Sequence, residues 1–162
     1  MLCGVEVDPL LRLDRQLCFA LYRASRAVVQ AYQPLLAEID VTYPQYLVLL
    51  LLWEQDGVPV KALGARLDLD SGTLTPLLRR LEARGLVTRT RSAADEREVL
   101  VGLTAAGRRL HAKARRIPRR LLEKSCLGAP EAGRLRAELH ALSDSFFAAS
   151  HEPETTIKKD SK

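Results

Sequence analysis

The sequence has few cysteines and no long apolar run, and each shortage excludes a class of protein. Its 162 residues contain three cysteines, Cys3, Cys18 and Cys126, and an odd number does not predict a structural disulfide framework. No run of about 18 uninterrupted apolar residues suggests a membrane span. The first residues lack the basic-then-apolar order of a signal peptide. We therefore expect a cytoplasmic protein with no membrane partner.

Patterns that bind metal ions are also missing. The sequence has no Cys-x-x-Cys pair, and its histidines, His111, His140 and His151, are scattered instead of standing at ligand spacing. We expect neither a metal nor another cofactor. The cysteines are then either buried apolar residues or redox-active thiols.

Basic charge is concentrated in one region of the chain. Residues 79–120 contain 13 Lys and Arg against 4 Asp and Glu, a net charge of +9, whereas the whole chain carries +5 and the remainder therefore −4. A basic region of this kind is the electrostatic footprint of a polyanion partner. A solvated basic face would have the same composition, so charge alone does not decide.

Residues 70–85 are the most informative stretch. Asp70 or Ser71 can cap the start of a helix, and Gly85 can end it in a left-handed conformation. Leucines recur at three- and four-residue spacing and predict one apolar stripe: Leu74, Leu77, Leu78 and Leu81. The opposite face carries hydroxyl and guanidinium groups, which bind phosphates and base edges: Ser71, Thr73, Thr75, Arg79 and Arg80. Alone, this pattern also fits an ordinary amphipathic surface helix.

The neighbouring segments favour a DNA-recognition helix. A short helix expected at residues 61–67 and a tight turn at 69–71 complete a helix-turn-helix. Two strands follow, at residues 86–91 and 99–103, joined by a charged turn. A hairpin in this place is typical of a wing, although an ordinary surface hairpin is the alternative. We expect Arg89, Arg91 and Arg97 at its tip, within reach of a minor groove or phosphates.

The remaining segments predict helices at both ends of the chain. These lie at residues 10–32 (ended by Pro34), 45–54, 105–124 (kinked or broken at Pro118) and 131–149, with an extended link at 58–60. The terminal helices have apolar faces and no core of their own, so we expect a homodimer. The predicted organisation is a flexible N-terminus (1–9), a dimerisation helix (10–35), a winged helix-turn-helix domain (36–104), C-terminal dimerisation helices (105–149) and a disordered tail (150–162). The fold class is mainly α with a small β-hairpin wing.

This order of elements resembles the MarR family of bacterial repressors. Residues 95–104, Asp-Glu-Arg-Glu-Val-Leu-Val-Gly-Leu-Thr, look like the family's wing pattern D-x-R-x-x-x-V-x-L-T. Within the family, three stretches are similar to repressors that respond to organic hydroperoxides, the OhrR type: residues 17–22, 39–46 and 69–78. The resemblance covers roughly residues 16–149.

The resemblance implies a repressor that holds double-stranded operator DNA as a reduced homodimer and releases it when an organic hydroperoxide oxidises Cys18. It implies that Tyr32 and Tyr43 hydrogen-bond the sensing sulfur and favour its thiolate, with Tyr22 one helical turn from Cys18. Tyr32 stands 14 residues from Cys18, roughly 21 Å along a helix, so it would have to act across the dimer. The sulfenic acid formed is then trapped either by an external thiol or, as we favour, by Cys126 of the other subunit.

The resemblance also assigns DNA contacts. These are Ser71, Thr73, Thr75 and Arg79 in the major groove, and Arg91 and Arg97 from the wing, with Asp95 holding Arg97 in position. Cys3 matches no position in the family, and we expect no role for it.

Two rival interpretations remain open. One is a repressor of the same family that releases DNA when it binds a small aromatic ligand at the dimer interface. The other is a thiol peroxidase, which would leave the helix-turn-helix unexplained. We therefore expect a regulator and not an enzyme.

Overall fold

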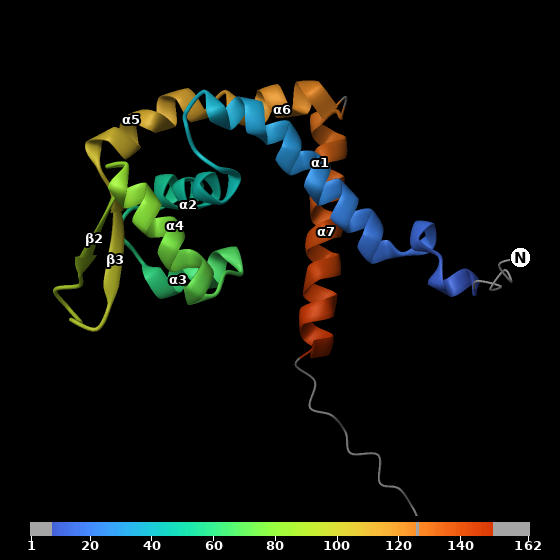
Figure 1. The fold of residues 1–162 in the computed structure, drawn as a ribbon, viewed down its shortest axis with the longest axis horizontal. Coiled ribbons are helices and arrows are strands. Elements are labelled where there is room, and N and C mark those ends of the chain that lie inside the picture. The colour runs from blue at the N-terminus through green and yellow to red at the C-terminus, as the bar shows by residue number, and fades with distance from the viewer. Residues whose placement is uncertain (1–7, 126, 151–162) are drawn as a thin grey trace, which may run out of the picture. The chain divides into compact units, whose positions relative to one another are not determined.

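The computed structural model describes residues 8–125 and 127–150 (Figure 1). The chain forms two compact units, residues 1–121 and 122–162. The flexible N-terminus and the disordered tail expected from the sequence lie almost entirely outside the described residues, as do Cys3 and Cys126. No helix among the described residues is long and apolar enough to cross a membrane. The described residues also contain no cluster of His, Cys, Asp or Glu that could hold a metal ion.

Helix α1 (Leu17–Ala37) differs from the predicted helix at both ends. Asp8 does cap a helical start, but only a 3₁₀ turn, Pro9–Leu11, followed by a second one, Leu13–Arg15. The backbone is extended at Arg12 and Gln16, so α1 begins seven residues later than expected. Its end was also predicted wrongly, because the helix continues through Pro34. Leu35 and Leu36 are only 1% and 2% exposed, and their burial offsets the backbone hydrogen bond that proline cannot make.

Helix α2 (Tyr43–Glu54) is the centre of the first unit. Its start is closed by the backbone N–H of Thr42, which donates to the Gln45 side chain (2.9 Å). Apolar residues on several sides of the helix are buried, as the sequence predicted: Tyr46, Val48, Leu49, Leu51 and Leu52. The helix-turn-helix and the sheet therefore pack against α2 in one hydrophobic core.

The helix-turn-helix consists of α3 (Val60–Leu67) and α4 (Ser71–Ala83). The turn between them passes through Asp68, whose φ is +51°, and closes where Leu69 N–H donates to the Gly64 carbonyl (3.0 Å). Asp70 is the N-cap of α4, and Gly85, with φ +65°, follows its C-terminus. Both predicted ends of the recognition helix are confirmed.

The wing is part of a three-stranded antiparallel sheet ordered β1-β3-β2. Strand β2 (Val87–Arg91) pairs with β3 (Val99–Leu103) from Val87–Leu103 at the base to Arg91–Val99 near the tip. The predicted extended link is β1 (Val58–Pro59), which pairs with β3 through Val58–Val101 and Pro59–Leu100. This pairing joins residues about 40 positions apart, and local pattern does not reveal it.

The C-terminal part contains α5 (Ala105–Ala114), α6 (Ile117–Ser125) and α7 (Ala129–Ser150). The single helix expected at 105–124 is broken, as Pro118 suggested, but the break lies at Arg115 and Arg116 because Pro118 occupies the first turn of α6. Helix α7 exposes a set of large apolar side chains: Leu135, Leu139, Phe146 and Phe147. The predicted class, mainly α with a small β wing, is confirmed.

Candidate DNA-binding surface and thiol site

Helix α4 divides into a buried face and an exposed face. The four leucines of the predicted stripe are buried: Leu74, Leu77, Leu78 and Leu81. Ser71, Thr73 and Arg79 are exposed, and Thr75 is half-buried. The structure therefore presents the predicted hydroxyl and guanidinium groups on the side of the helix that faces away from the core.

The start of α4 is closed by its own side chains. Asp70 Oδ1 accepts from the backbone N–H of Thr73 (2.8 Å), and Asp70 Oδ2 accepts from the Thr73 hydroxyl (3.0 Å). These hydrogen bonds lower the pKa of Asp70 from its usual value. Because the Thr73 hydroxyl donates to Asp70, it can serve DNA only as an acceptor, whereas the Ser71 hydroxyl has no such partner among the described residues.

The tip of the wing is a folded turn. Ser92 N–H donates to the Glu98 carbonyl (2.8 Å), and the buried Ser92 hydroxyl accepts from Ala94 N–H (3.2 Å). Asp95 Oδ1 accepts from the backbone N–H of Arg97 (2.9 Å). The carboxylate thus fixes the backbone at Arg97 and leaves the guanidinium exposed. Among the described residues, no ion pair involves this side chain.

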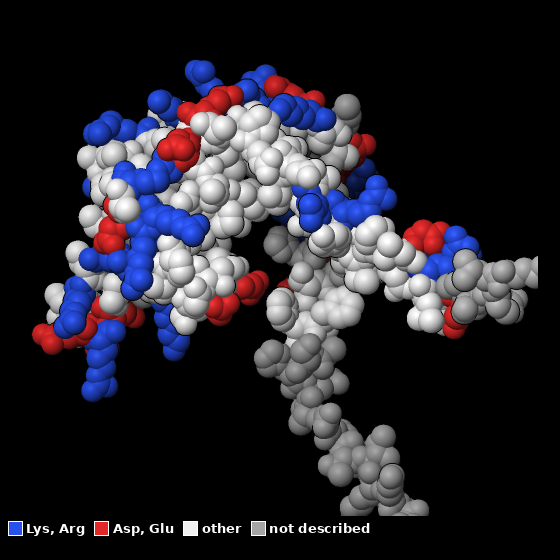
Figure 2. All heavy atoms as spheres, viewed as in Figure 1, with Lys and Arg blue, Asp and Glu red and all other residues white. Residues whose placement is uncertain are grey.

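Arg89 does not lie at the wing tip, and that expectation is wrong. It stands in the middle of β2, and its Nε donates to Glu82 Oε2 (2.9 Å) on α4. This hydrogen bond lowers the pKa of Glu82. Arg91 and Arg97 are exposed, so the predicted wing contacts reduce to these two. Figure 2 shows basic side chains projecting from the wing region, with acidic ones beside them at its tip.

One groove brings the helix and wing residues together. It has a volume of about 620 Å³ and is lined by Ser71 and Thr75 of α4 and by Asp95 and Arg97 of the wing turn. Lys61, the second residue of α3, also lines it and is exposed. Lys61 was not among the predicted site residues, although a basic residue at the start of the helix that precedes a recognition helix fits the electrostatic pattern of a DNA-binding surface.

Cys18 lies in the first turn of α1 and is exposed to solvent. Tyr22, one turn further on, is also exposed. Its hydroxyl accepts from Arg26 Nη1 (2.9 Å), and the guanidinium of Arg26 stands 5.5 Å from the Tyr22 ring centre. An exposed thiol has the access to solvent that a peroxide sensor requires.

Tyr32 and Tyr43 come together at the other end of α1. Their ring centres are 5.0 Å apart, and Tyr46 lies 5.8 Å from Tyr32. Burial, and for Tyr32 also the neighbouring Tyr43, raises the pKa of both side chains. Burial is also the largest cause that raises the pKa of Tyr46, to about 12. Tyr46 was not among the predicted site residues, although Tyr43 and Tyr46 share a helix face at three-residue spacing.

Within one chain, the fold does not join the thiol to these tyrosines. Cys18 and Tyr32 lie on one continuous helix, 14 residues and so roughly 21 Å apart along its axis. Cys126, the expected resolving cysteine, lies outside the described residues.

Comparison with known proteins shows which chains this one is similar to. Residues 41–99 match the MarR family. The chain is 48% identical over 132 residues to the organic hydroperoxide resistance transcriptional regulator of Bacillus subtilis, a match that covers 82% of this chain and 90% of the relative.

Solved structures give the same fold. The reduced AbfR of Staphylococcus epidermidis bound to DNA has a TM-score of 0.73 and 35% identity, covering 90% of this chain and 100% of that one. The PcaV regulator of Streptomyces coelicolor, in complex with its natural ligand, has a TM-score of 0.74 and 26% identity, covering 87% and 98% of the two chains.

Proposed function

Because this chain belongs to the MarR family, we propose that it is a redox-sensing transcriptional repressor that binds operator DNA as a reduced homodimer. An organic hydroperoxide is the proposed signal, and oxidation of Cys18 releases the DNA. One observation carries this proposal: Cys18 is exposed near the start of α1, and the rings of Tyr32 and Tyr43 lie together at the far end of the same helix.

DNA binding is supported by the groove between α4 and the wing. Ser71, Thr75 and Arg97 line one concave surface, so the helix and the wing can contact one duplex together. Arg79 of α4 and Arg91 of β2 are also exposed to solvent. We propose that α4 enters a major groove and that the wing contacts phosphates or a minor groove.

A homodimer is supported by exposed apolar side chains at both ends of the chain. Leu10, Leu11, Leu13 and Leu17 are all more than half exposed before and at the start of α1, and α7 exposes the leucines and phenylalanines described above. Groups of exposed apolar side chains mark interaction surfaces. Two-fold pairing through these helices would also supply two recognition helices to successive major grooves.

The proposed chemistry at Cys18 is nucleophilic. The Cys18 thiolate attacks one peroxide oxygen, the O–O bond breaks, and the alcohol leaves after taking a proton, so that sulfur is oxidised to a sulfenic acid. Tyr32 and Tyr43 of the partner subunit would donate hydrogen bonds to the sulfur. Burial raises the pKa of both phenols, which keeps them protonated and able to donate.

A disulfide with Cys126 of the other subunit is the proposed second step. The Cys126 thiolate attacks the sulfenic sulfur, the S–S bond forms, and the oxygen leaves as water after protonation. Forming this bond requires the two cysteines to approach within disulfide geometry. For cysteines that begin far apart this approach requires backbone movement, and we propose that the movement changes the separation of the two recognition helices.

Release by a small aromatic ligand is the second candidate, because PcaV shares the fold and is solved with its natural ligand. Catalytic peroxide removal has less support, because a peroxidase does not need a winged helix-turn-helix. The similar proteins named above are also regulators.

The test is operator binding before and after oxidation. Duplexes are first selected from a random library with the reduced protein, and binding is then measured for wild type, Cys18→Ser, Cys126→Ser and, as a control, Cys3→Ser. Cumene hydroperoxide should release wild type and Cys3→Ser but not Cys18→Ser, and non-reducing electrophoresis should show a crosslinked dimer that Cys126→Ser lacks. If Cys18→Ser releases DNA as wild type does, the thiol is not the sensor.

A further inference from the structure

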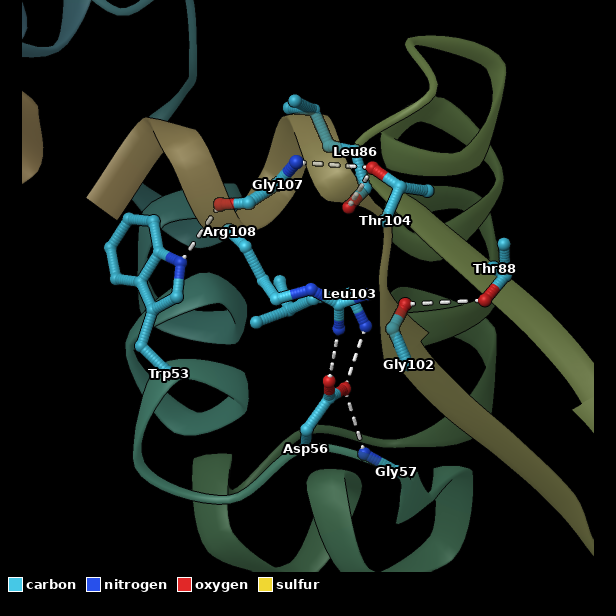
Figure 3. A network of polar contacts seen from close by, with 10 residues as sticks. All are labelled: Trp53, Asp56, Gly57, Leu86, Thr88, Gly102, Leu103, Thr104, Gly107 and Arg108. Carbon is cyan, nitrogen blue, oxygen red and sulfur yellow. Dashed lines mark hydrogen bonds and ion pairs between the residues drawn. The ribbon is translucent and has the colours of Figure 1, made fainter. Parts of the chain in front are cut away.

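The carboxylate of Asp56 replaces a backbone carbonyl as a hydrogen-bond acceptor in the sheet. Strand β1 pairs with β3 as Val58–Val101, so the residue opposite Leu103 in this register is Asp56. The backbone has left the ladder there, because Gly57 turns with φ +72°. Asp56 Oδ1 instead accepts from Leu103 N–H (2.7 Å) and from Gly57 N–H (2.9 Å) (Figure 3).

The other oxygen of Asp56 reaches the next helix. Asp56 Oδ2 accepts from Arg108 Nη1 (2.6 Å), and Arg108 stands in the first turns of α5. Nearby, Trp53 Nε1 donates to the Gly107 carbonyl (3.0 Å). The last turn of α2 and the bend that follows it therefore bind both the last residue of β3 and the beginning of α5.

This junction is the base of the wing. Leu103 pairs on its other side with Val87, the first residue of β2. From this base the ribbon extends five residues at about 3.4 Å each before the tip turn that carries Arg97. A small rotation at the base therefore becomes a larger displacement at the tip.

We propose that Asp56 is a positioning residue for DNA binding, which fixes the direction of the wing so that Arg91 and Arg97 meet the duplex while α4 occupies the major groove. This inference rests on the proposed repressor function. Asp56 itself lies at the end of β3 away from the tip and does not line the groove between α4 and the wing. Its effect passes through the hydrogen bond that Leu103 N–H donates to it, and the exposed ion pair with Arg108 contributes little.

The two contacts of Asp56 can be separated by substitution. The ion pair with Arg108 is exposed, with 43% and 58% of the two side chains accessible, and exposed pairs contribute little. The hydrogen bond from Leu103 carries more, since losing it leaves a strand-end N–H without its partner. Asp56→Asn keeps a carbonyl oxygen for Leu103 and removes the charge, Arg108→Ala removes only the ion pair, and Asp56→Ala removes both.

The experiment compares these variants with Glu54→Ala, which breaks another exposed ion pair, to Arg66, at the same end of α2. Binding of the reduced protein to its selected duplex is measured against salt and by hydroxyl-radical footprinting. Asp56→Ala should weaken binding by at least about tenfold, the size of one lost specific contact. Its salt slope should fall by roughly 3–4, because the homodimer has two wings and each wing has two arginines that would bind phosphates. Protection under the wing should disappear, while protection under α4 remains. Asp56→Asn, Arg108→Ala and Glu54→Ala should stay close to wild type.

Full protection under the wing in Asp56→Ala, or an equal loss under the wing and α4, would overturn the proposal. A second measurement needs no DNA. In hydrogen exchange, Asp56→Ala should speed exchange in residues 87–103 and leave residues 74–81 unchanged, and unchanged exchange in the strands also contradicts the proposal. Failure of the repressor function would appear separately, as a wild type that selects no duplex.

Discussion

Arg89 of the wing and Glu82 of the recognition helix form a hydrogen-bonded ion pair, with Arg89 Nε donating to Glu82 Oε2 at 2.9 Å. The pair is partly shielded, with 28% and 37% of the two side chains exposed. It connects the middle of β2 to the last turns of α4. Two carboxylates therefore bind the wing: Asp56, in the bend after α2, at its base, and Glu82 of α4 along its length.

The Glu82–Arg89 pair should make stability depend on pH in the acid range. Arg89 lowers the pKa of Glu82 below its usual 4.5, so the folded state favours the ionised carboxylate. The stabilisation is therefore fully present above the usual pKa and is lost as pH falls through the lowered one. Urea unfolding of wild type and Glu82→Gln should differ at neutral pH and converge in acid.

The control for this prediction is Arg89→Gln. If Glu82 acts through Arg89, the double variant should be no less stable than either single variant at neutral pH. A difference between wild type and Glu82→Gln that persists unchanged in acid would contradict the role of this ion pair.

A tyrosine cluster should give a second, alkaline pH dependence. The pKa of Tyr46 is raised from 10.0 to about 12 by burial and by Tyr32 and Tyr43. Folding therefore favours the protonated phenol, and its stabilisation is complete below pH 10 and lost as pH rises from about 10 to about 12. Unfolding measured across this range should show the loss in wild type and a smaller loss in Tyr46→Phe. Equal losses in the two proteins would show that another group is responsible.

Gly107 of α5 should tolerate no side chain. A Cβ there would overlap the carbonyl oxygen of Leu86, which already accepts from Thr104. Gly107→Ala should cost at least about 1–3 kcal/mol of stability, since the backbones at the wing base must separate. Gly133, inside α7, has nothing within 4 Å of such a Cβ. Gly133→Ala should therefore stabilise by roughly 0.5–1 kcal/mol. Thermal unfolding of the pair checks both signs, and a neutral Gly107→Ala would contradict the close approach.

Much of the fold follows from local chemistry in the sequence. Asp70 and Gly85 are capping residues whose side chain or backbone freedom acts within a few residues of their own position. The apolar stripe of α4 depends only on helical spacing. These features were predicted correctly because each has its cause nearby in the chain.

The errors come from partners distant in sequence or from tertiary packing. Pro34 remains helical because Leu35 and Leu36 are buried by the core, which the segment itself does not reveal. The expected place of Arg89 at the wing tip is wrong because this side chain pairs with Glu82, and that pairing depends on how β2 crosses α4. The hydrogen bond between Asp56 and Leu103 depends on the register between β1 and β3. A two-residue strand such as β1 is too short for its sequence to predict that register.

The tyrosine pair offers the sharpest test of the sensor, because its proposed action crosses the dimer. Tyr32 lies roughly 21 Å along α1 from Cys18 of its own chain, so its hydroxyl can serve only the partner's thiol. Cys18 oxidation should therefore slow about tenfold or more in a homodimer that carries Tyr32→Phe and Tyr43→Phe, the loss expected when a reactive group loses its positioned hydrogen-bond donors. Unfolding measurements should show that the fold is retained.

A mixed dimer distinguishes action across the dimer from action within a chain. One subunit carries Cys18→Ser and keeps its tyrosines, and the other keeps Cys18 and carries both Phe substitutions. The remaining thiol then faces intact tyrosines across the interface, so it should react with cumene hydroperoxide at the wild-type rate. Slow oxidation in this mixed dimer, measured by trapping the sulfenic acid, would show that each chain uses its own tyrosines. That outcome would require a bend in α1 that its unbroken helix from Leu17 to Ala37 does not contain.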